Sequence, residues 1–246
     1  MLNASNLTKN FGPIQAVRGI SFSVEKGEVL GFLGPNGAGK STTMRIITGF
    51  LPPTEGTASI CGHDILEEPV EAKSHLGYLP ENAPSYRAMT VTGFLDFVAD
   101  VHGFRGSEKR DRVEDAIRKC HIESVRNRVI DELSKGYRQR TCFAQAILHD
   151  PEVLVMDEPT DGLDPNQKHV VREMIRAMGE DKAIILSTHI LEEVDAVCTR
   201  AIIIAEGRIV ANGTPAELRA MDPQGRLDVV FRTLTMGGAE EESRHV

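Results

Sequence analysis

The stretch of sequence that decides the fold is residues 29–49, VLGFLGPNGAGKSTTMRIITG. It opens with an apolar run that predicts a strand, passes through a glycine-rich turn, and ends in a segment whose apolar residues recur at helical spacing. Between strand and helix, residues 34–41 (GPNGAGKS) match G-x-x-x-x-G-K-[ST] at every fixed position. A turn that merely joins a strand to a helix is the alternative. The match within this strand–turn–helix context favours a phosphate-binding loop.

The residue types in this loop suit phosphate chemistry. Gly34, Gly37 and Gly39 carry no Cβ, so successive backbone N–H groups can point inward at phosphate oxygens. The helix beginning near Lys40 adds the positive end of its dipole, the Lys40 ammonium suits the β- and γ-phosphates, and the Ser41 hydroxyl suits Mg²⁺. We therefore expect a nucleoside triphosphate to contact Gly34, Pro35, Asn36, Gly37, Ala38, Gly39, Lys40, Ser41 and Thr42.

Composition limits the class of protein. The chain has 246 residues, of which 41% are hydrophobic and 26% charged, as in an ordinary soluble globular protein of one large or two small domains. Its net charge of −8 argues against a protein that coats duplex nucleic acid. The N-terminus lacks the apolar core of a signal peptide, and the apolar runs are too short to cross a bilayer. Any membrane span would come from another chain.

The four cysteines are widely scattered, at positions 61, 120, 142 and 198, with no C-x-x-C pair. Such spacing is typical of reduced, mostly buried thiols in a cytosolic protein. We therefore predict neither a disulfide framework nor a zinc site.

Strand and helix patterns alternate along the chain. Strands are predicted over residues 2–8, 20–25, 57–61, 76–80, 153–156, 183–187, 201–205, 208–212 and 226–233. Residues 82–150 have a helical pattern, a capping box at Thr214 and Glu217 opens a late helix, and the polar tail 237–246 is expected to be mobile. Strands that carry polar residues at their ends and alternate with helices indicate an α/β fold with a parallel sheet.

Two adjacent carboxylates, Asp157 and Glu158, end an apolar strand. Asp157 suits a contact with Mg²⁺, whereas Glu158 suits orienting and deprotonating a water that attacks the γ-phosphate. Solvated strand ends also carry acids without function, which is the alternative. A buried strand that links this pair to the phosphate loop favours catalysis.

A second anion-binding helix start is predicted at residues 133–140, LSKGYRQR, where Ser134 is a natural N-cap and Gly136 leaves the backbone open. It either caps a helix only, or it serves a triphosphate held by another copy of the protein. Phe11, in the turn after the first strand, is either a hairpin residue or a platform on which a base stacks.

At this point the sequence resembles a known family, the ATP-binding subunits of ABC transporters, over residues 2 to about 220. The resemblance rests on residues 34–41, 133–140 and 153–160 (VLVMDEPT), with GLD at 162–164 and STH at 187–189. It implies a P-loop NTPase with a RecA-like parallel core sheet, an N-terminal antiparallel β subdomain and an inserted α-helical subdomain. The single ATPase domain would cover 1–221, with its core at about 1–81 and 151–221, its helical subdomain at about 82–150, and an extension at 222–246.

The resemblance also implies roles for single residues. Lys40, Ser41 and Asp157 would hold ATP with Mg²⁺, Glu158 would be the general base, and His189 would steady the γ-phosphate and the attacking water.

The resemblance further implies residues that act across a dimer of two subunits, and this chain departs from the family pattern at Phe11 and Glu81. Ser134 and Gly136 would reach the γ-phosphate of the partner's ATP, and Asp164 would link the two sites. Phe11 replaces the usual tyrosine beside the base. Glu81 stands where glutamine is usual, and its carboxylate can also ligate Mg²⁺.

The function implied is an ATPase subunit of a transporter. Two copies, or this chain and a paralogous subunit, would close on two MgATP and drive a separate polytopic permease at the cytoplasmic face of the membrane. The motifs look most like the branch that serves drug or other export and gliding motility, and no nucleic acid is expected as partner. Alternatives are a soluble ABC ATPase of the repair or translation type, or a kinase, which leaves residues 134–140 and His189 unexplained.

Overall fold

The computed structural model describes residues 1–82 and 85–236 and contains two sheets. The first is four-stranded, in the order β2-β1-β4-β5, and its pairings are antiparallel. Its strands are β1 (Leu2–Phe11), β2 (Ile14–Val24), β4 (Glu55–Ile60) and β5 (His63–Asp64). β1 and β2 are longer than the predicted strands 2–8 and 20–25, because the turn between them is confined to Gly12 and Pro13.

The second sheet is six-stranded, in the order β10-β9-β3-β8-β7-β6. Its strands are β3 (Val29–Leu33), β6 (Leu76–Leu79), β7 (Val153–Asp157), β8 (Ala183–Thr188), β9 (Arg200–Ala205) and β10 (Arg208–Gly213). β9, β3, β8, β7 and β6 run parallel, and β10 pairs antiparallel with β9. The continuous apolar runs of β3, β7 and β8 are buried on both faces, as expected for central parallel strands. The predicted parallel α/β sheet is confirmed.

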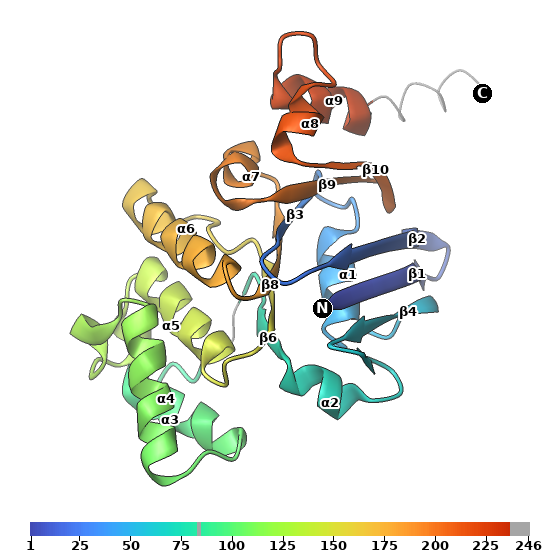
Figure 1. Ribbon diagram of the computed structural model, residues 1–246. Helices are drawn as coiled ribbons and strands as arrows, with labels where there is room; N and C mark the ends of the chain where they lie inside the picture. The colour runs from blue at the N-terminus through green and yellow to red at the C-terminus, as the bar shows by residue number, and fades with distance from the viewer. Residues whose placement is uncertain (83–84, 237–246) are drawn as a thin grey trace.

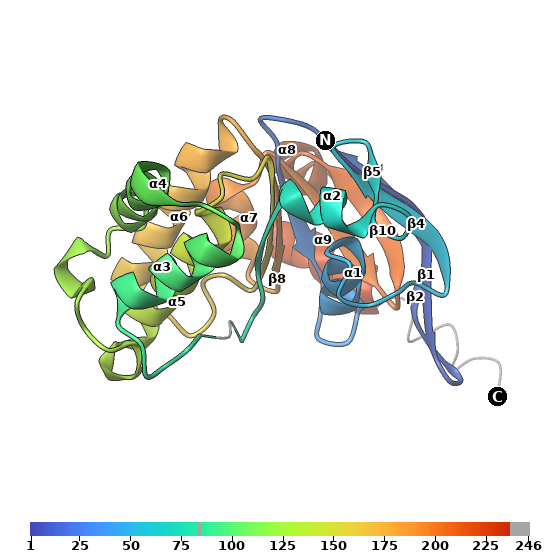
Figure 2. The same ribbon diagram turned by 90° about the horizontal axis from the view of Figure 1, so that it is seen from below.

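The two faces of this sheet belong to different hydrophobic cores. Alternate residues of β7 show the division, since Val153 and Val155 pack with the antiparallel sheet, whereas Leu154 and Met156 pack with helices on the opposite face. Figures 1 and 2 both place β1, β2, β4 and α1 (Lys40–Ile47) on one side of this sheet. On the other side lie the helices α3 (Val91–Val101), α4 (Gly106–Lys119), α5 (Lys135–Ile147) and α6 (Pro165–Gly179). α2 (Pro69–Ser74) leads into β6.

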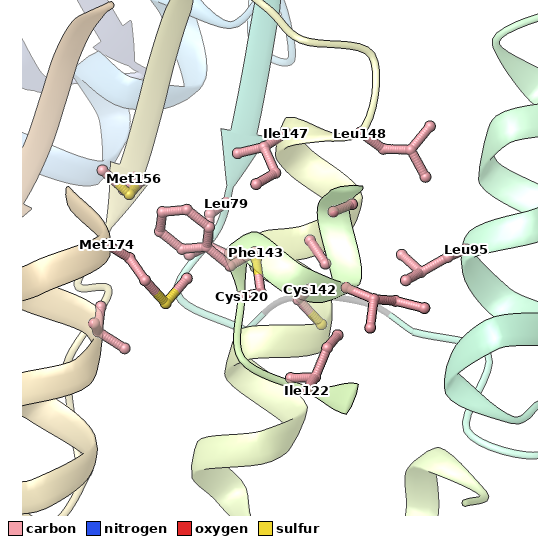
Figure 3. Close-up of a cluster of buried hydrophobic side chains, with 14 of the residues drawn as sticks. Leu79, Leu95, Cys120, Ile122, Cys142, Phe143, Ile147, Leu148, Met156 and Met174 are labelled. Atoms are coloured by element: carbon pink, nitrogen blue, oxygen red, sulfur yellow. The ribbon is translucent and has the colours of Figure 1, made fainter. Parts of the chain in front are cut away.

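The helical side contains α3 (Val91–Val101), α4 (Gly106–Lys119), α5 (Lys135–Ile147) and α6 (Pro165–Gly179), with short 3₁₀ turns at Glu123–Val125 and Ile130–Glu132. Thr90 caps α3, accepting a hydrogen bond from the Gly93 amide at 3.1 Å. Phe143 of α5 lies at the centre of the core, close to Leu79 and Met156 of the sheet (Figure 3). Close approach of α5 to β6 requires Gly77, because a Cβ there would lie 2.3 Å from the Ala146 carbonyl oxygen.

The C-terminal part differs from the prediction at one element. Thr214 and Glu217 form the predicted capping box at the start of α8 (Pro215–Arg219). The strand predicted over 226–233 is wrong, because these residues belong to the helix α9 (Leu227–Met236). Leu227, Val230, Phe231 and Leu234 recur at i, i+3, i+4 and i+7 and pack toward β9 and β10 (Figure 1).

The predicted mobile tail, 237–246, lies outside the described residues. Within the described ranges, no helix combines the length and the apolar character that crossing a membrane requires.

Candidate active site

The phosphate-binding loop follows β3 and closes tightly against neighbouring backbone. A Cβ on Gly39 would lie 2.5 Å from the Ala16 carbonyl oxygen, and Gly39 has a φ of 104°. A Cβ on Gly34 would lie 2.5 Å from the Ile204 carbonyl oxygen. Gly39 is the N-cap of α1, and among the described residues no side chain caps this helix start. The first-turn N–H groups of α1 are therefore placed to bind an anion.

Lys40, the first residue of α1, is buried, with 6% of its surface exposed. Its Nζ donates to the carbonyl oxygens of Gly34 at 2.7 Å and Pro35 at 3.2 Å, and lies 3.8 Å from Glu158 Oε1. Burial lowers the pKa of Lys40, while the nearby Glu158, Asp157 and Glu81 oppose that shift. The ammonium group therefore lies against the phosphate-binding loop, where it can reach a phosphate bound inside that loop.

Asp157, at the end of β7, is buried beside two hydroxyl groups. The Ser41 hydroxyl donates to Asp157 Oδ1 at 3.1 Å, and the Ser187 hydroxyl of β8 donates to the same oxygen. A carboxylate beside a serine hydroxyl at the end of a phosphate loop is the set of hard oxygen ligands that Mg²⁺ prefers. The residues present therefore fit a magnesium ion.

Glu158 comes directly after β7 and has a φ of 51°, a left-handed conformation that is uncommon for glutamate. Two hydrogen bonds stabilise this conformation, because the Glu158 N–H donates to the Ser187 carbonyl oxygen and to Ser187 Oγ, both at 3.2 Å. Its Oε2 lies 3.0 Å from His189 Nδ1, beyond the end of β8. The left-handed turn thus directs the Glu158 carboxylate toward Lys40 on one side and His189 on the other.

Most of the predicted residues line one pocket of about 420 Å³ at the carboxyl ends of the parallel strands. The sequence-predicted site residues that line this pocket are Asn36, Gly37, Gly39, Lys40, Ser41, Thr42, Glu81, Glu158 and His189. Gly34, Ala38 and Asp157 are buried behind this surface, whereas Pro35 is exposed in the same loop. Gly34 and Pro35 contact Lys40, and Asp157 contacts Ser41.

Four predicted residues lie away from the pocket surface. Phe11, at the end of β1, is 48% exposed, and Lys9 Nζ lies 5.4 Å from its ring centroid. Ser134 caps α5, accepting from the Tyr137 amide at 3.4 Å, and Asp164 caps α6, accepting from the amides of the second and third residues of that helix. A Cβ on Gly136 would lie 2.5 Å from Gln167 Oε1, so the starts of α5 and α6 pack together.

The sequence-based prediction missed three residues of this region. Ser187 received no role, although its hydroxyl bonds Asp157; its position opposite Asp157 on the neighbouring strand was the available signal. Ala16 and Asp161 also line the pocket. Asp161 lies 3.7 Å from Lys135 Nζ, so an ion pair joins the start of α5 to the wall of this chain's own pocket.

Fold and site together define the class of the protein as a P-loop NTPase. Comparison with known proteins then identifies the family: residues 17–161 match the family model described as "ABC transporter". Because this match covers more than half of the chain, the protein belongs to the ABC transporter family and is an ABC ATPase domain.

Curated relatives have related names. The chain is 35% identical to the ABC transporter ATP-binding protein NatA of Bacillus subtilis over 227 residues, and this alignment covers 92% of each chain. It is 37% identical over 215 residues to a Nod factor export ATP-binding protein I of Paraburkholderia xenovorans, covering 87% of this chain and 71% of that one. It is 36% identical over 221 residues to the probable multidrug ABC transporter ATP-binding protein YbhF of Escherichia coli, covering 89% of this chain but only 38% of that protein.

Solved structures share the fold. A structure titled as the ATP-binding subunit of an ABC transporter superposes with a TM-score of 0.85 at 29% identity, covering 95% of this chain and 99% of that chain. A dimeric structure of the ATP-binding cassette MJ0796 bound to ADP and Pi superposes with a TM-score of 0.79 at 23% identity, covering 87% of this chain and 98% of that chain. The predicted family and the P-loop NTPase fold are therefore confirmed.

Proposed function

We propose that this chain binds ATP with Mg²⁺, hydrolyses it as one half of a head-to-tail dimer, and drives a separate membrane permease. One observation carries the hydrolytic part: the phosphate loop, the Asp157–Ser41 pair and the Glu158–His189 pair converge at one end of the parallel sheet. Such a set combines anion binding, a metal ligand and a positioned base in one place.

Binding uses the loop and the start of α1. Phosphate oxygens replace the carbonyl oxygens of Gly34 and Pro35 as partners of Lys40, and the first-turn N–H groups of α1 donate to the phosphates. Ser41 and Asp157 hold Mg²⁺, with Glu81 at the pocket wall as a further carboxylate. When bound, this ion neutralises charge on the β- and γ-phosphates.

Hydrolysis uses Glu158 and His189. Glu158 accepts a proton from a water whose oxygen bonds to the γ-phosphorus, while the bond from that phosphorus to the β–γ bridging oxygen breaks, giving ADP and phosphate. His189 is within hydrogen-bond distance of Glu158, so it can orient both the carboxylate and the γ-phosphate. Ser187 holds the Glu158 backbone in its left-handed turn.

A second copy supplies the remaining contacts. Ser134 and Gly136 lie at the start of α5, whose N-terminal end offers a second anion site outside this chain's own pocket. Asp164 caps the adjacent helix and would link the two sites. The dimeric MJ0796 cassette supports this arrangement, and a paralogous ATPase subunit could take the place of the second copy. Phe11 would stack on the adenine base from the end of β1.

The membrane partner is proposed from the relatives. Their names include ATP-binding proteins of multidrug transport and Nod factor export, which supports export through a separate permease, with this chain peripheral on the inner face of the membrane. The chain spans only 38% of the length of the YbhF relatives. A soluble, non-transport ABC ATPase is the second candidate. A permease that co-purifies with the chain and stimulates its hydrolysis would distinguish the two.

Two substitutions test binding and chemistry separately. Lys40→Ala removes a charge-assisted interaction of about 1.5–3 kcal/mol, so ATP affinity should fall roughly ten- to a hundredfold. Glu158→Gln keeps the size of the side chain but removes the base, so the variant should bind ATP and lose turnover by about 10²–10⁴-fold. Glu180→Gln, an exposed change at the end of α6, is the matched control. Normal steady-state hydrolysis by Glu158→Gln would exclude Glu158 as the base.

A third substitution tests the dimer. Ser134→Arg places a bulky side chain at the start of α5, and Ser134 does not line the chain's own pocket, so the variant should abolish turnover while ATP binding to the monomer persists. Unchanged turnover in this variant, or full hydrolysis by a strictly monomeric protein, would exclude the second copy from the site.

A further inference from the structure

Three chemically different donor groups meet on the side of the molecule away from the nucleotide pocket. Cys61, His75 and Glu152 each place one ligand atom so that all three atoms lie within 4.8 Å of one another. They offer a thiol sulfur, an imidazole nitrogen and a carboxylate oxygen. None of the three has a role in the nucleotide chemistry proposed above.

The register of the parallel sheet explains why two of them are neighbours. Leu76 of β6 pairs with Val153 of β7, and the Val153 amide donates to the His75 carbonyl oxygen at 3.0 Å. His75 and Glu152 immediately precede these strands, so parallel pairing places them side by side. Their side chains meet, with His75 Nδ1 lying 3.0 Å from Glu152 Oε2.

A tight hairpin presents the third donor. Ile60 of β4 pairs with His63 of β5, so Cys61 and Gly62 form a two-residue turn. Both turn residues have positive φ, 50° for Cys61 and 93° for Gly62, as in the turns that suit hairpin twist. The Cys61 amide also donates to the Met1 carbonyl oxygen at 2.8 Å, which fixes the position of the turn. A cysteine at a positive-φ position, where glycine or asparagine is favoured, is unusual and needs an explanation.

An imidazole of the same hairpin lies next to this group. The rings of His63 and His75 stack with centroids 5.5 Å apart and an angle of 6° between their planes. His63 pairs with Glu68 at 3.3 Å and is only partly exposed. It lies on the hairpin that carries Cys61, and its stacking holds the ring of His75.

We propose that Cys61, His75 and Glu152 form a binding site for a divalent transition-metal ion of the zinc class. Cysteine, histidine and glutamate are the ligands that Zn²⁺ takes in proteins, whereas a thiolate does not suit Mg²⁺ or Ca²⁺. Ligand atoms around a tetrahedral zinc lie about 3.5 Å apart. Side-chain rotations of these partly exposed residues bring the three atoms to that separation. The ion would join the β4–β5 hairpin of the antiparallel sheet to the start of β7 in the parallel sheet.

This site is distinct from the nucleotide's Mg²⁺. His75 and Glu152 lie at the amino ends of β6 and β7 and Cys61 lies in the β4–β5 turn, whereas Asp157 is the last residue of β7, at its carboxyl end. The scattered cysteines led to the expectation of no zinc site. That expectation used spacing along the chain, and the three ligands here lie in segments that only the folded sheet brings together.

Titration with Co²⁺ tests the proposal directly. The reduced protein, with any histidine tag removed, should bind one Co²⁺ and develop a near-ultraviolet thiolate-to-cobalt charge-transfer band that Zn²⁺ abolishes by displacement. Cys61→Ser should eliminate this band, and His75→Ala and Glu152→Gln should each weaken Co²⁺ binding by about tenfold or more. Cys198→Ser and His169→Ala are the matched controls and should leave the titration unchanged, because neither residue belongs to the group of three donors.

Thermal unfolding with and without Zn²⁺ gives a second readout that does not depend on colour. An ion that binds only the folded state raises the unfolding temperature. Wild type and Cys198→Ser should therefore be stabilised by Zn²⁺, and Cys61→Ser should not. A band that persists in Cys61→Ser, or no stoichiometric Co²⁺ binding by folded wild-type protein, would overturn the proposal.

Discussion

A histidine at the end of α5 makes the stability of this protein sensitive to acid. His149 Nε2 donates to the Leu76 carbonyl oxygen at 3.1 Å, and its ring stacks on His102 with centroids 4.3 Å apart. Its Nδ1 is buried, and no described residue offers it a hydrogen-bond partner. A proton added at Nδ1 would therefore place a charge where neither water nor an acceptor can stabilise it.

The size of the effect follows from the pKa. The pKa of His149 is lowered from 6.5 to about 4, chiefly by burial and next by the neighbouring His102, while the bond to the Leu76 carbonyl oxygen opposes part of the shift. The unfolded chain then binds more protons than the folded chain between these two pKa values, so stability is present at neutral pH and is lost as pH falls through 6.5 toward 4. Between pH 7.5 and 5.5 the expected loss is about 1.3 kcal/mol, from roughly 1.4 kcal/mol for each pKa unit of difference.

Urea unfolding at pH 7.5 and 5.5 measures this loss. His149→Gln keeps an amide donor for the Leu76 carbonyl oxygen but cannot take up a proton, so it should lose about 1 kcal/mol less than wild type over this pH interval. His169→Gln, a change at an exposed histidine of α6, is the control and should behave like wild type. Equal pH dependence in wild type and His149→Gln would refute the reasoning.

Three further substitutions test the packing described above, each by urea unfolding at neutral pH. Gly77→Ala forces a Cβ against the Ala146 carbonyl oxygen and should cost about 1–3 kcal/mol. Phe143→Ala empties the centre of the helical core and should cost about 3–5 kcal/mol. Arg172→Met leaves the Glu193 carboxylate, which is 1% exposed, without its ion-pair partner. The cost should be near the lower end of about 3–5 kcal/mol, because Arg172 is partly exposed, and the further change Glu193→Leu should recover most of it.

Much of the fold follows from local patterns in the sequence. Apolar runs such as residues 153–156 predict buried strands, and Thr214 with Glu217 predicts a helix start that the structure confirms. The error at 226–233 has a physical cause. Its β-branched and aromatic residues suggest a strand, whereas their spacing is helical, and α9 forms because that spacing gives one apolar face to cover β9 and β10.

Site residues that lie in one sequence motif could be predicted from that motif. Site residues that come together only through strand pairing in the sheet were harder to predict. Gly39 and Lys40 are adjacent in sequence, so the motif alone predicts their chemistry. Ser187 approaches Asp157 only because β7 and β8 pair in parallel, and the strand order is absent from any local pattern. The left-handed turn at Glu158 also breaks the simple alternation of strand faces, which places its carboxylate at the pocket surface while that of Asp157 stays behind it.

The charges of the pocket argue that the nucleotide enters with its cation. The buried ammonium group of Lys40 lies near the carboxylates of Glu81, Asp157 and Glu158. Near Lys40 these carboxylates outnumber the ammonium group, so their negative charge opposes that of an incoming triphosphate. A divalent ion held by Ser41 and Asp157 would offset this excess, because two like charges about 4 Å apart repel by about 4 kcal/mol at an effective dielectric constant of about 20. In the proposed mechanism Glu158 is not a metal ligand, so its carboxylate would stay available to take a proton from water.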